Sequence, residues 1–213
     1  MGRKRKCQNE LVAESDREFV LTSAARLFRE QGFDHTSVKE ISEACNMLPG
    51  SLYYRYPSKE SLLVDLMRLA LEQASTALLK AFQEVTDPAE QIRRAINAHL
   101  GLLVGGSDMV YVLLFEWRSL RGAERQEMID LRDRYEALWD SKLRSLSELG
   151  LIRPDIDLSL LRLIGIGALN WTATWFRKDG YYSSEDIGDF VWRIIRDSII
   201  NQPLIIKDTN GLS

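Results

Sequence analysis

A short stretch in the first third of the chain carries side chains that suit contact with a nucleic acid. They are small, polar, aromatic or cationic, and they comprise Pro49, Gly50, Ser51, Tyr53, Tyr54 and Arg55. Hydroxyl and guanidinium groups bind phosphate oxygens, and the same groups can read base edges in the major groove. The residue types therefore suggest recognition of duplex DNA, provided that one element presents them together.

Two short helices joined by a tight turn are predicted around this stretch. The first helix has its start signal in Thr36 or Ser37, and Ser37 with Glu40 fits a capping box. The helical pattern breaks at Asn46, because an Asn side chain tolerates the left-handed backbone angles of a turn. Pro49 then suits the first position of the second helix, where no backbone donor is needed.

The second helix is expected to divide its residues between two faces. Leu52 and Tyr56 lie four residues apart and would pack inward, which leaves the polar and aromatic set exposed. Leu48 precedes the helix and offers no side-chain cap. The arrangement predicts a helix-turn-helix whose second helix enters the major groove, with Ser51 and Arg55 best suited to reach base edges.

Several motifs in this region resemble the DNA-binding domain of the tetracycline-repressor (TetR) family. They are residues 24–33 (AARLFREQGF), 36–38 with Ile41, 50–54 (GSLYY) and 58–60, in order and without a gap. A DNA reader of this kind would hold phosphates mainly through Thr36, Ser37, Tyr53, Tyr54 and Lys59. The pair Leu48-Pro49 before this second helix is similar to a branch that regulates steroid or fatty-acid breakdown and answers to acyl-CoA thioesters.

The composition gives the chain no strong basic charge. Its 213 residues carry a net charge of −3, with 45% hydrophobic and 28% charged residues. This is the composition of one globular unit or two small ones, and it disfavours disorder. DNA binding must therefore come from local placement of charge. The basic run at residues 3–6 could follow phosphates or enter a minor groove, or it could be only a solvated tail.

Two further features bear on the compartment. The longest uncharged run, residues 163–176, has 14 residues and is too short to span a bilayer, so no membrane partner is expected. Cys7 and Cys45 form no Cys-x-x-Cys pair, which is compatible with a reducing environment. A cytoplasmic protein is therefore predicted.

The rest of the chain is predicted to form a series of helices. Start signals occur at Ser15 with Glu18, at Ser58, at Asp87, near Asp157 and at Ser183 or Ser184. No strand-like alternation competes with them, so the predicted fold is all-α, with an N-terminal three-helix helix-turn-helix domain and a C-terminal helical bundle. The expected divisions are a basic flexible tail (1–14), the DNA-binding domain (15–63), a ligand-binding and dimerisation domain (64–201) and a C-terminal tail (202–213).

A ligand pocket is predicted in the bundle, because polar and aromatic groups lie within otherwise apolar helices. The candidates are His99, Tyr111, Glu116, Trp117, Arg118, Asn170, Trp171 and Trp175. These residues could instead fill the core, with the polar groups satisfying one another. The family resemblance favours a small hydrophobic effector, for which an acyl-CoA is one hypothesis.

The helix expected from about 157 to 175 is the most apolar in the chain and must be covered on both sides. One stripe of this helix and the apolar stripe of the last helix are predicted to pair across a homodimer interface, as a four-helix bundle. The candidates are Leu161, Gly165, Ala168, Thr172, Ile187, Phe190, Val191 and Ile194. A neighbouring stripe of the same helix holds Leu160, Ile164, Gly167, Trp171 and Trp175.

The leading interpretation is a dimeric, ligand-responsive DNA-binding regulator. The family resemblance implies a repressor that its effector releases from a near-palindromic operator. Two alternatives are a helical ligand-binding or scaffolding protein with a vestigial helix-turn-helix, and a multidrug-type sensor. An enzyme is disfavoured, because the two histidines, His35 and His99, belong to no metal-binding or catalytic pattern. No cofactor and no metal are expected.

Overall fold

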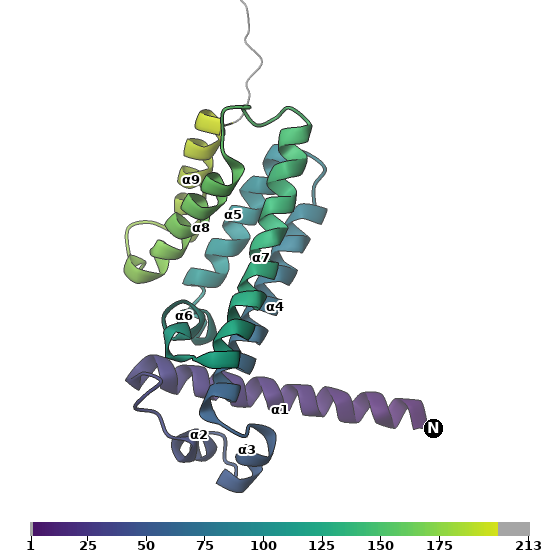
Figure 1. Ribbon diagram of the computed structural model, residues 1–213, viewed down its shortest axis with the longest axis vertical. Helices are drawn as coiled ribbons and strands as arrows, with labels where there is room; N and C mark the ends of the chain where they lie inside the picture. Colours follow the sequence, from purple (N-terminus) through teal and green to yellow (C-terminus); the bar gives the residue numbers. More distant parts are fainter. Residues whose placement is uncertain (1, 200–213) are drawn as a thin grey trace, which may run out of the picture.

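The computed structural model describes the backbone of residues 2–199, and the side chains from Ser15 onward apart from Ser198. The tail expected over 202–213 lies outside the described residues. Helices make up most of the described chain, as the sequence predicts (Figure 1). They are α1 (Gly2–Gln31), α2 (Val38–Ala44), α3 (Pro49–Arg55), α4 (Lys59–Gln83), α5 (Pro88–Val104), α6 (Asp108–Phe115), the 3-10 turn η1 (Trp117–Ser119), α7 (Gly122–Glu148), α8 (Leu158–Trp175) and α9 (Ser184–Ile199).

The first helix begins earlier than expected. It starts at Gly2 and not at Ser15, where the sequence predicts a capping box with Glu18. Residues 2–14 therefore belong to a helix and do not form the flexible tail that the basic run suggests. The composition explains the difference, because Lys, Arg and Glu, which are good helix formers, make up about half of this segment, and it contains no Pro.

The helix-turn-helix forms as predicted. The Ser37 hydroxyl accepts from the Glu40 amide at 3.2 Å, and the Glu40 carboxylate accepts from the Ser37 amide at 2.7 Å, which completes the capping box of α2. Asn46 takes the left-handed backbone of the turn, with φ of 53°. Leu48 stands before α3 without a side-chain cap, and Pro49 occupies the first turn. Local signals were sufficient here because each acts on the backbone within a few residues.

The long helix α4 joins the helix-turn-helix to the bundle. Its cap is Ser58, whose hydroxyl accepts from the Ser61 amide at 3.0 Å. From there α4 runs up the molecule beside α5 and α7 (Figure 1). Buried side chains along it, such as Leu62, Leu66 and Leu78, belong to one core that extends from α1 to α9. The expected boundary after residue 63 thus falls inside a helix, and the two parts share a core.

The helix α5 is the centre of the C-terminal bundle. It contacts α4, α6, α8 and α9, and α8 and α9 lie on the other side of it from α4 (Figure 1). The predicted caps are present: Asp87 accepts from the Glu90 amide, Asp157 caps α8, and Ser183 accepts from the Asp186 amide. Among residues 2–199, no single helix is long and apolar enough to cross a membrane; α5 and α6 satisfy that test only as a pair bent by 95°.

Candidate nucleic-acid interface and ligand cavity

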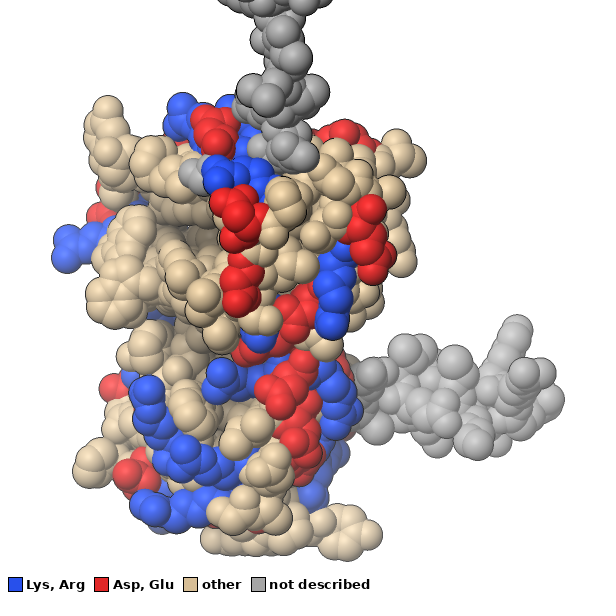
Figure 2. Space-filling view, turned by 45° about the horizontal axis from the view of Figure 1, so that its top comes forward, with Lys and Arg blue, Asp and Glu red and all other residues tan. Residues whose placement is uncertain are grey.

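The outer face of α3 presents the residues that the sequence singles out for DNA contact. Pro49, Gly50, Ser51 and Arg55 are exposed, as are Tyr53 and Tyr54, with 94% of Tyr54 open to solvent. Leu52 and Tyr56 are buried, so the predicted division of this helix between two faces is confirmed. Lys and Arg side chains also gather over the lower part of the molecule in Figure 2, at and around the level of α1. The surface suits a polyanion.

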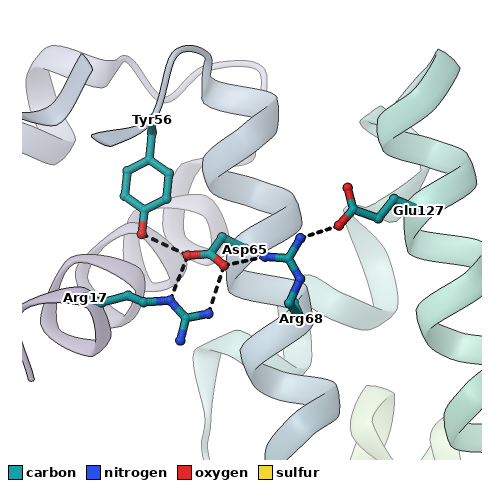
Figure 3. A network of polar contacts seen from close by, with 5 residues as sticks. All are labelled: Arg17, Tyr56, Asp65, Arg68 and Glu127. Carbon is teal, nitrogen blue, oxygen red and sulfur yellow. Dashed lines mark hydrogen bonds and ion pairs between the residues drawn. The ribbon is translucent and has the colours of Figure 1, made fainter. Parts of the chain in front are cut away.

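A partly buried polar network holds α3 on its inner side (Figure 3). The Asp65 carboxylate on α4 accepts two hydrogen bonds from Arg17 on α1, at 2.9 and 2.8 Å, and one from Arg68 at 2.7 Å. The Tyr56 hydroxyl, at the end of α3, donates to the same carboxylate at 3.0 Å. Arg68 also pairs with Glu127 on α7. One carboxylate therefore connects α1, α3 and α4, and Arg68 extends the connection to the bundle.

The network favours the ionised form of Asp65. Burial by itself raises the pKa of this carboxyl, but the hydrogen bonds from Arg17 and Tyr56 outweigh burial, so the pKa lies below its usual range. Burial and the Asp65 carboxylate together raise the pKa of Tyr56, which keeps its hydroxyl as a donor. At neutral pH the network thus holds a charged acceptor surrounded by donors, the arrangement that gives strong hydrogen bonds.

Two of the expected phosphate ligands have other partners in the structure. Only 2% of Thr36 is exposed, and its hydroxyl donates to the Gly32 carbonyl at 2.8 Å. The Lys59 ammonium donates to the Phe33 and Thr36 carbonyls at 2.6 and 2.9 Å and lies 4.3 Å from the Phe33 ring centroid. Both side chains hold the loop between α1 and α2, and this role replaces the predicted one as phosphate ligands. The other three predicted phosphate ligands, Ser37, Tyr53 and Tyr54, are exposed.

A cavity of about 420 Å³ lies between α4, α5, α6, α7 and α8. Five of the predicted ligand-binding residues line it: His99, Trp117, Arg118, Asn170 and Trp171. The other three lie elsewhere. Tyr111 faces α1, where the Arg29 guanidinium lies 5.0 Å from its ring centroid; Glu116 ends α6 and accepts from Ser119; and Trp175 is exposed near the end of α8.

The sequence analysis missed four polar residues of this cavity: Arg132, Tyr135 and Glu136 on α7, and Thr174 on α8. Helix α7 is rich in charged residues, which obscure the apolar stripe on its inner side. A signal was available, because Tyr135 stands four residues before the buried Trp139 and four after Leu131. That spacing marks an apolar stripe on an otherwise solvated helix and turns Tyr135 inward.

A neutral hydrogen-bonded cluster lies at the wall of the cavity. The His99 ring is buried between Tyr135 and Asn170, and burial lowers its pKa to about 4. A neutral imidazole has one donor and one acceptor nitrogen. Because Asn170 Oδ1 only accepts, Nε2 of His99 donates to it at 3.0 Å, and the Tyr135 hydroxyl donates to Nδ1 at 2.7 Å. The cluster offers polarity without charge.

The His99 site predicts a specific pH dependence of stability. The pKa of about 4 lies below the ordinary 6.5, so the unfolded chain binds the additional proton first as the pH falls. Between pH 7 and pH 5 the native protein should lose about 2 kcal/mol more of its unfolding free energy than a His99→Gln variant. Urea unfolding at both pH values measures this, with His35→Gln, an exposed histidine, as control. Equal losses in wild type and His99→Gln would contradict the assignment.

The two neighbouring stripes of α8 differ in burial, and the stripe predicted to form the dimer interface is mostly the one that packs inside its own protomer. Leu161 and Gly165 line a second, apolar cavity of about 130 Å³ inside the bundle, and Thr172 is buried. On α9, Ile187 and Val191 pack against the same core. Of the predicted dimer residues, only Ala168, Phe190 and Ile194 are exposed. The exposed apolar stripe is instead the neighbouring one, with Leu160, Ile164, Gly167, Trp171 and Trp175.

Comparisons with known proteins agree with this architecture. A family model described as bacterial regulatory proteins, tetR family, matches residues 20–66. A second, described as tetracyclin repressor-like, C-terminal domain, matches residues 85–199, which is more than half of the chain.

Individual relatives align over most of their length. The TetR family regulator PfmR from Thermus thermophilus is 32% identical, with a TM-score of 0.74, over 84% of this chain and 97% of that one. AibR, solved in complex with isovaleryl coenzyme A and operator DNA, is 28% identical, with a TM-score of 0.76, over the same shares. The HTH-type transcriptional repressor KstR2 of Mycobacterium tuberculosis is 25% identical over 88% of this chain and 94% of its own. The chain thus belongs to the TetR family of bacterial transcriptional regulators.

Proposed function

We propose that this protein is a cytoplasmic repressor that binds a two-fold symmetric operator as a homodimer. Each protomer places α3 in a major groove, and the two half-sites lie about one helical turn apart. A small effector with an apolar acyl group, joined to coenzyme A as a thioester, enters the cavity of the bundle and releases the operator.

One helix, α4, contributes both to the support of the DNA-reading helix and to the ligand cavity. At its start, α4 supplies Asp65, to which the Tyr56 hydroxyl at the end of α3 donates. One to three turns further on, Ala70, Leu71 and Ala74 of α4 line the cavity. A ligand that prefers one position of α4 therefore also prefers one position of α3. This differential affinity is what an effector needs to shift operator binding.

The cavity suits a thioester with an apolar acyl group. Most of its wall is hydrophobic, and His99, Tyr135 and Asn170 provide neutral hydrogen-bonding groups that can position a carbonyl. AibR, whose fold this chain shares, was solved with isovaleryl coenzyme A and operator DNA. KstR2 is named a transcriptional repressor.

Selection of bound duplexes from a random DNA pool tests the DNA-binding part of the proposal. We expect a symmetric sequence to be enriched, and acyl-CoA thioesters to release the protein from it in a mobility-shift titration. Enrichment without symmetry would contradict a dimeric reader. Release by apolar drugs or dyes but by no thioester would point to a multidrug-type sensor.

Replacing Arg55 by Gln should weaken binding to the selected operator about tenfold or more at near-physiological salt, because a guanidinium that reads a base edge contributes roughly 1–3 kcal/mol. Arg144→Gln, which alters an exposed arginine near the far end of α7, is the matched control. Fluorescence anisotropy with labelled operator gives both affinities. If the two variants bind equally well, Arg55 makes no base contact.

A further inference from the structure

Three arginines surround a single tryptophan beside the ligand cavity. The guanidinium carbons of Arg118, Arg125 and Arg132 lie 5.2, 5.3 and 5.2 Å from the centroid of the Trp117 ring. Arg118 follows Trp117 in η1, and the other two come from the first three turns of α7. Since all three lie near the same ring centroid, any two of the guanidinium carbons are within about 10.5 Å of each other.

The positive charge of this cluster is only partly balanced. Arg132 has one acidic partner, Glu136 at 3.6 Å, and Glu136 is shared with Arg162. Arg118 and Arg125 are exposed, and neither forms a salt bridge with any residue that the structure describes. One arginine stacked on a tryptophan needs no ligand. Three gathered on one ring repel one another, and an anion of several charges would relieve that repulsion.

The cluster is continuous with the cavity. Trp117, Arg118 and Arg132 belong to the cavity wall, and the rest of that wall is largely apolar, with Leu102, Leu113 and Ile166 among its members. A ligand that fills this space therefore meets hydrophobic side chains with one part and guanidinium groups with another. Arginine donates paired hydrogen bonds that match the geometry of phosphate oxygens.

We propose that Arg118, Arg125 and Arg132, held in place by Trp117, form a phosphate-binding subsite for the nucleotide part of a coenzyme A thioester. The diphosphate and the 3′-phosphate contact the guanidinium groups, and the acyl group extends into the cavity toward His99. This assignment rests on the proposed function, because it takes the effector to be such a thioester. On this assignment, the nucleotide part of the effector contributes most of the affinity of the protein for the thioester.

The test compares two probes that share an acyl group. Octanoyl-CoA carries the phosphates, and octanoyl-pantetheine lacks the nucleotide. By isothermal titration of the full-length chain, we expect octanoyl-CoA to bind at least 100-fold more tightly. The double variant Arg118→Gln/Arg125→Gln should weaken octanoyl-CoA about 100-fold, roughly tenfold per charged donor, and leave octanoyl-pantetheine unchanged. Arg134→Gln, an exposed arginine of the same helix, should change neither affinity. Thermal melting confirms that the variants fold.

Two results would overturn the subsite. Either the native protein binds both probes equally well, or the double variant weakens both to the same extent. If octanoyl-pantetheine also released the operator in those cases, the thioester effector would stand and only the subsite would be lost. If neither probe bound, and the isovaleryl and palmitoyl pairs tested beside them also failed, both the subsite and the thioester part of the proposed function would be wrong.

Discussion

Replacing Asp65 by Asn is expected to lower the free energy of unfolding by about 2–4 kcal/mol. The side chain is 14% exposed and accepts from Arg17, Tyr56 and Arg68, so the change leaves cations without their anion. This expected loss of stability is smaller than the full cost of breaking a buried ion pair, because 30% of the Arg17 side chain and 34% of the Arg68 side chain are exposed. Urea unfolding at pH 7 measures the loss. Asp133→Asn, the same change at an exposed position of α7, should have little effect.

The pH dependence of this loss distinguishes the charge of Asp65 from simple packing. Because the pKa of Asp65 is lowered in the folded protein, its ionised form contributes stability above the unfolded pKa and loses that contribution as pH falls through the folded pKa. The difference between native protein and Asp65→Asn should therefore shrink in the acidic range. A difference that stays constant with pH would mean that the variant acts through packing.

Operator binding should suffer as well, because the network fixes the inner side of α3. At a temperature where the variant is folded, we expect Asp65→Asn to bind the operator at least tenfold more weakly. Glu127→Gln removes only the link from Arg68 to α7, and 45% of that carboxylate side chain is exposed. Its effect on stability should stay within about 0.5 kcal/mol. Unchanged operator affinity in Asp65→Asn would show that α3 holds its position without the network.

The parts of the fold that could be predicted from sequence are those set by neighbouring residues. The capping box of Ser37 and Glu40, the left-handed Asn46 and the inward pair Leu52 and Tyr56 all depend on contacts within one helix or turn. Such signals act on the chain before any tertiary contact forms. They were enough to place the exposed face of α3.

The sequence could not predict features that depend on packing between distant segments. Lys59 opens α4, which suits a phosphate, but the fold brings its ammonium to the carbonyls of Phe33 and Thr36, more than twenty residues earlier. The orientation of α8 also depends on packing between distant segments. A helix that is apolar around its circumference offers two stripes, and its periodicity does not say which one faces its own core. Only the positions of α5 and α7 decide that Leu161 points inward and Ile164 outward.

The exposed apolar stripe of α8 is the expected interface between two copies of this chain. Ile164 is 69% exposed, and Leu160, Trp171 and Trp175, which lie at helical spacing along the same stripe of α8, are exposed as well. Phe190 and Ile194 are exposed apolar residues of α9. Contiguous apolar surface of this kind marks an interface, and homodimer interfaces are among the most apolar. Gly167 and Ala168 on the exposed side of α8 would let two copies of the helix approach closely.

Replacing Ile164 by Glu should raise the dimer dissociation constant at least about 100-fold, since a two-fold interface would bury two unpaired carboxylates at a cost of roughly 3 kcal/mol or more. Sedimentation equilibrium measures the constant, and Leu149→Glu, at a position 64% exposed outside this face, is the control. Operator affinity should fall together with dimerisation, because a monomer holds only one half-site. A dimeric Ile164→Glu variant would move the interface away from α8. A monomeric variant that bound the operator with native affinity would show that the two α3 helices do not act as a pair.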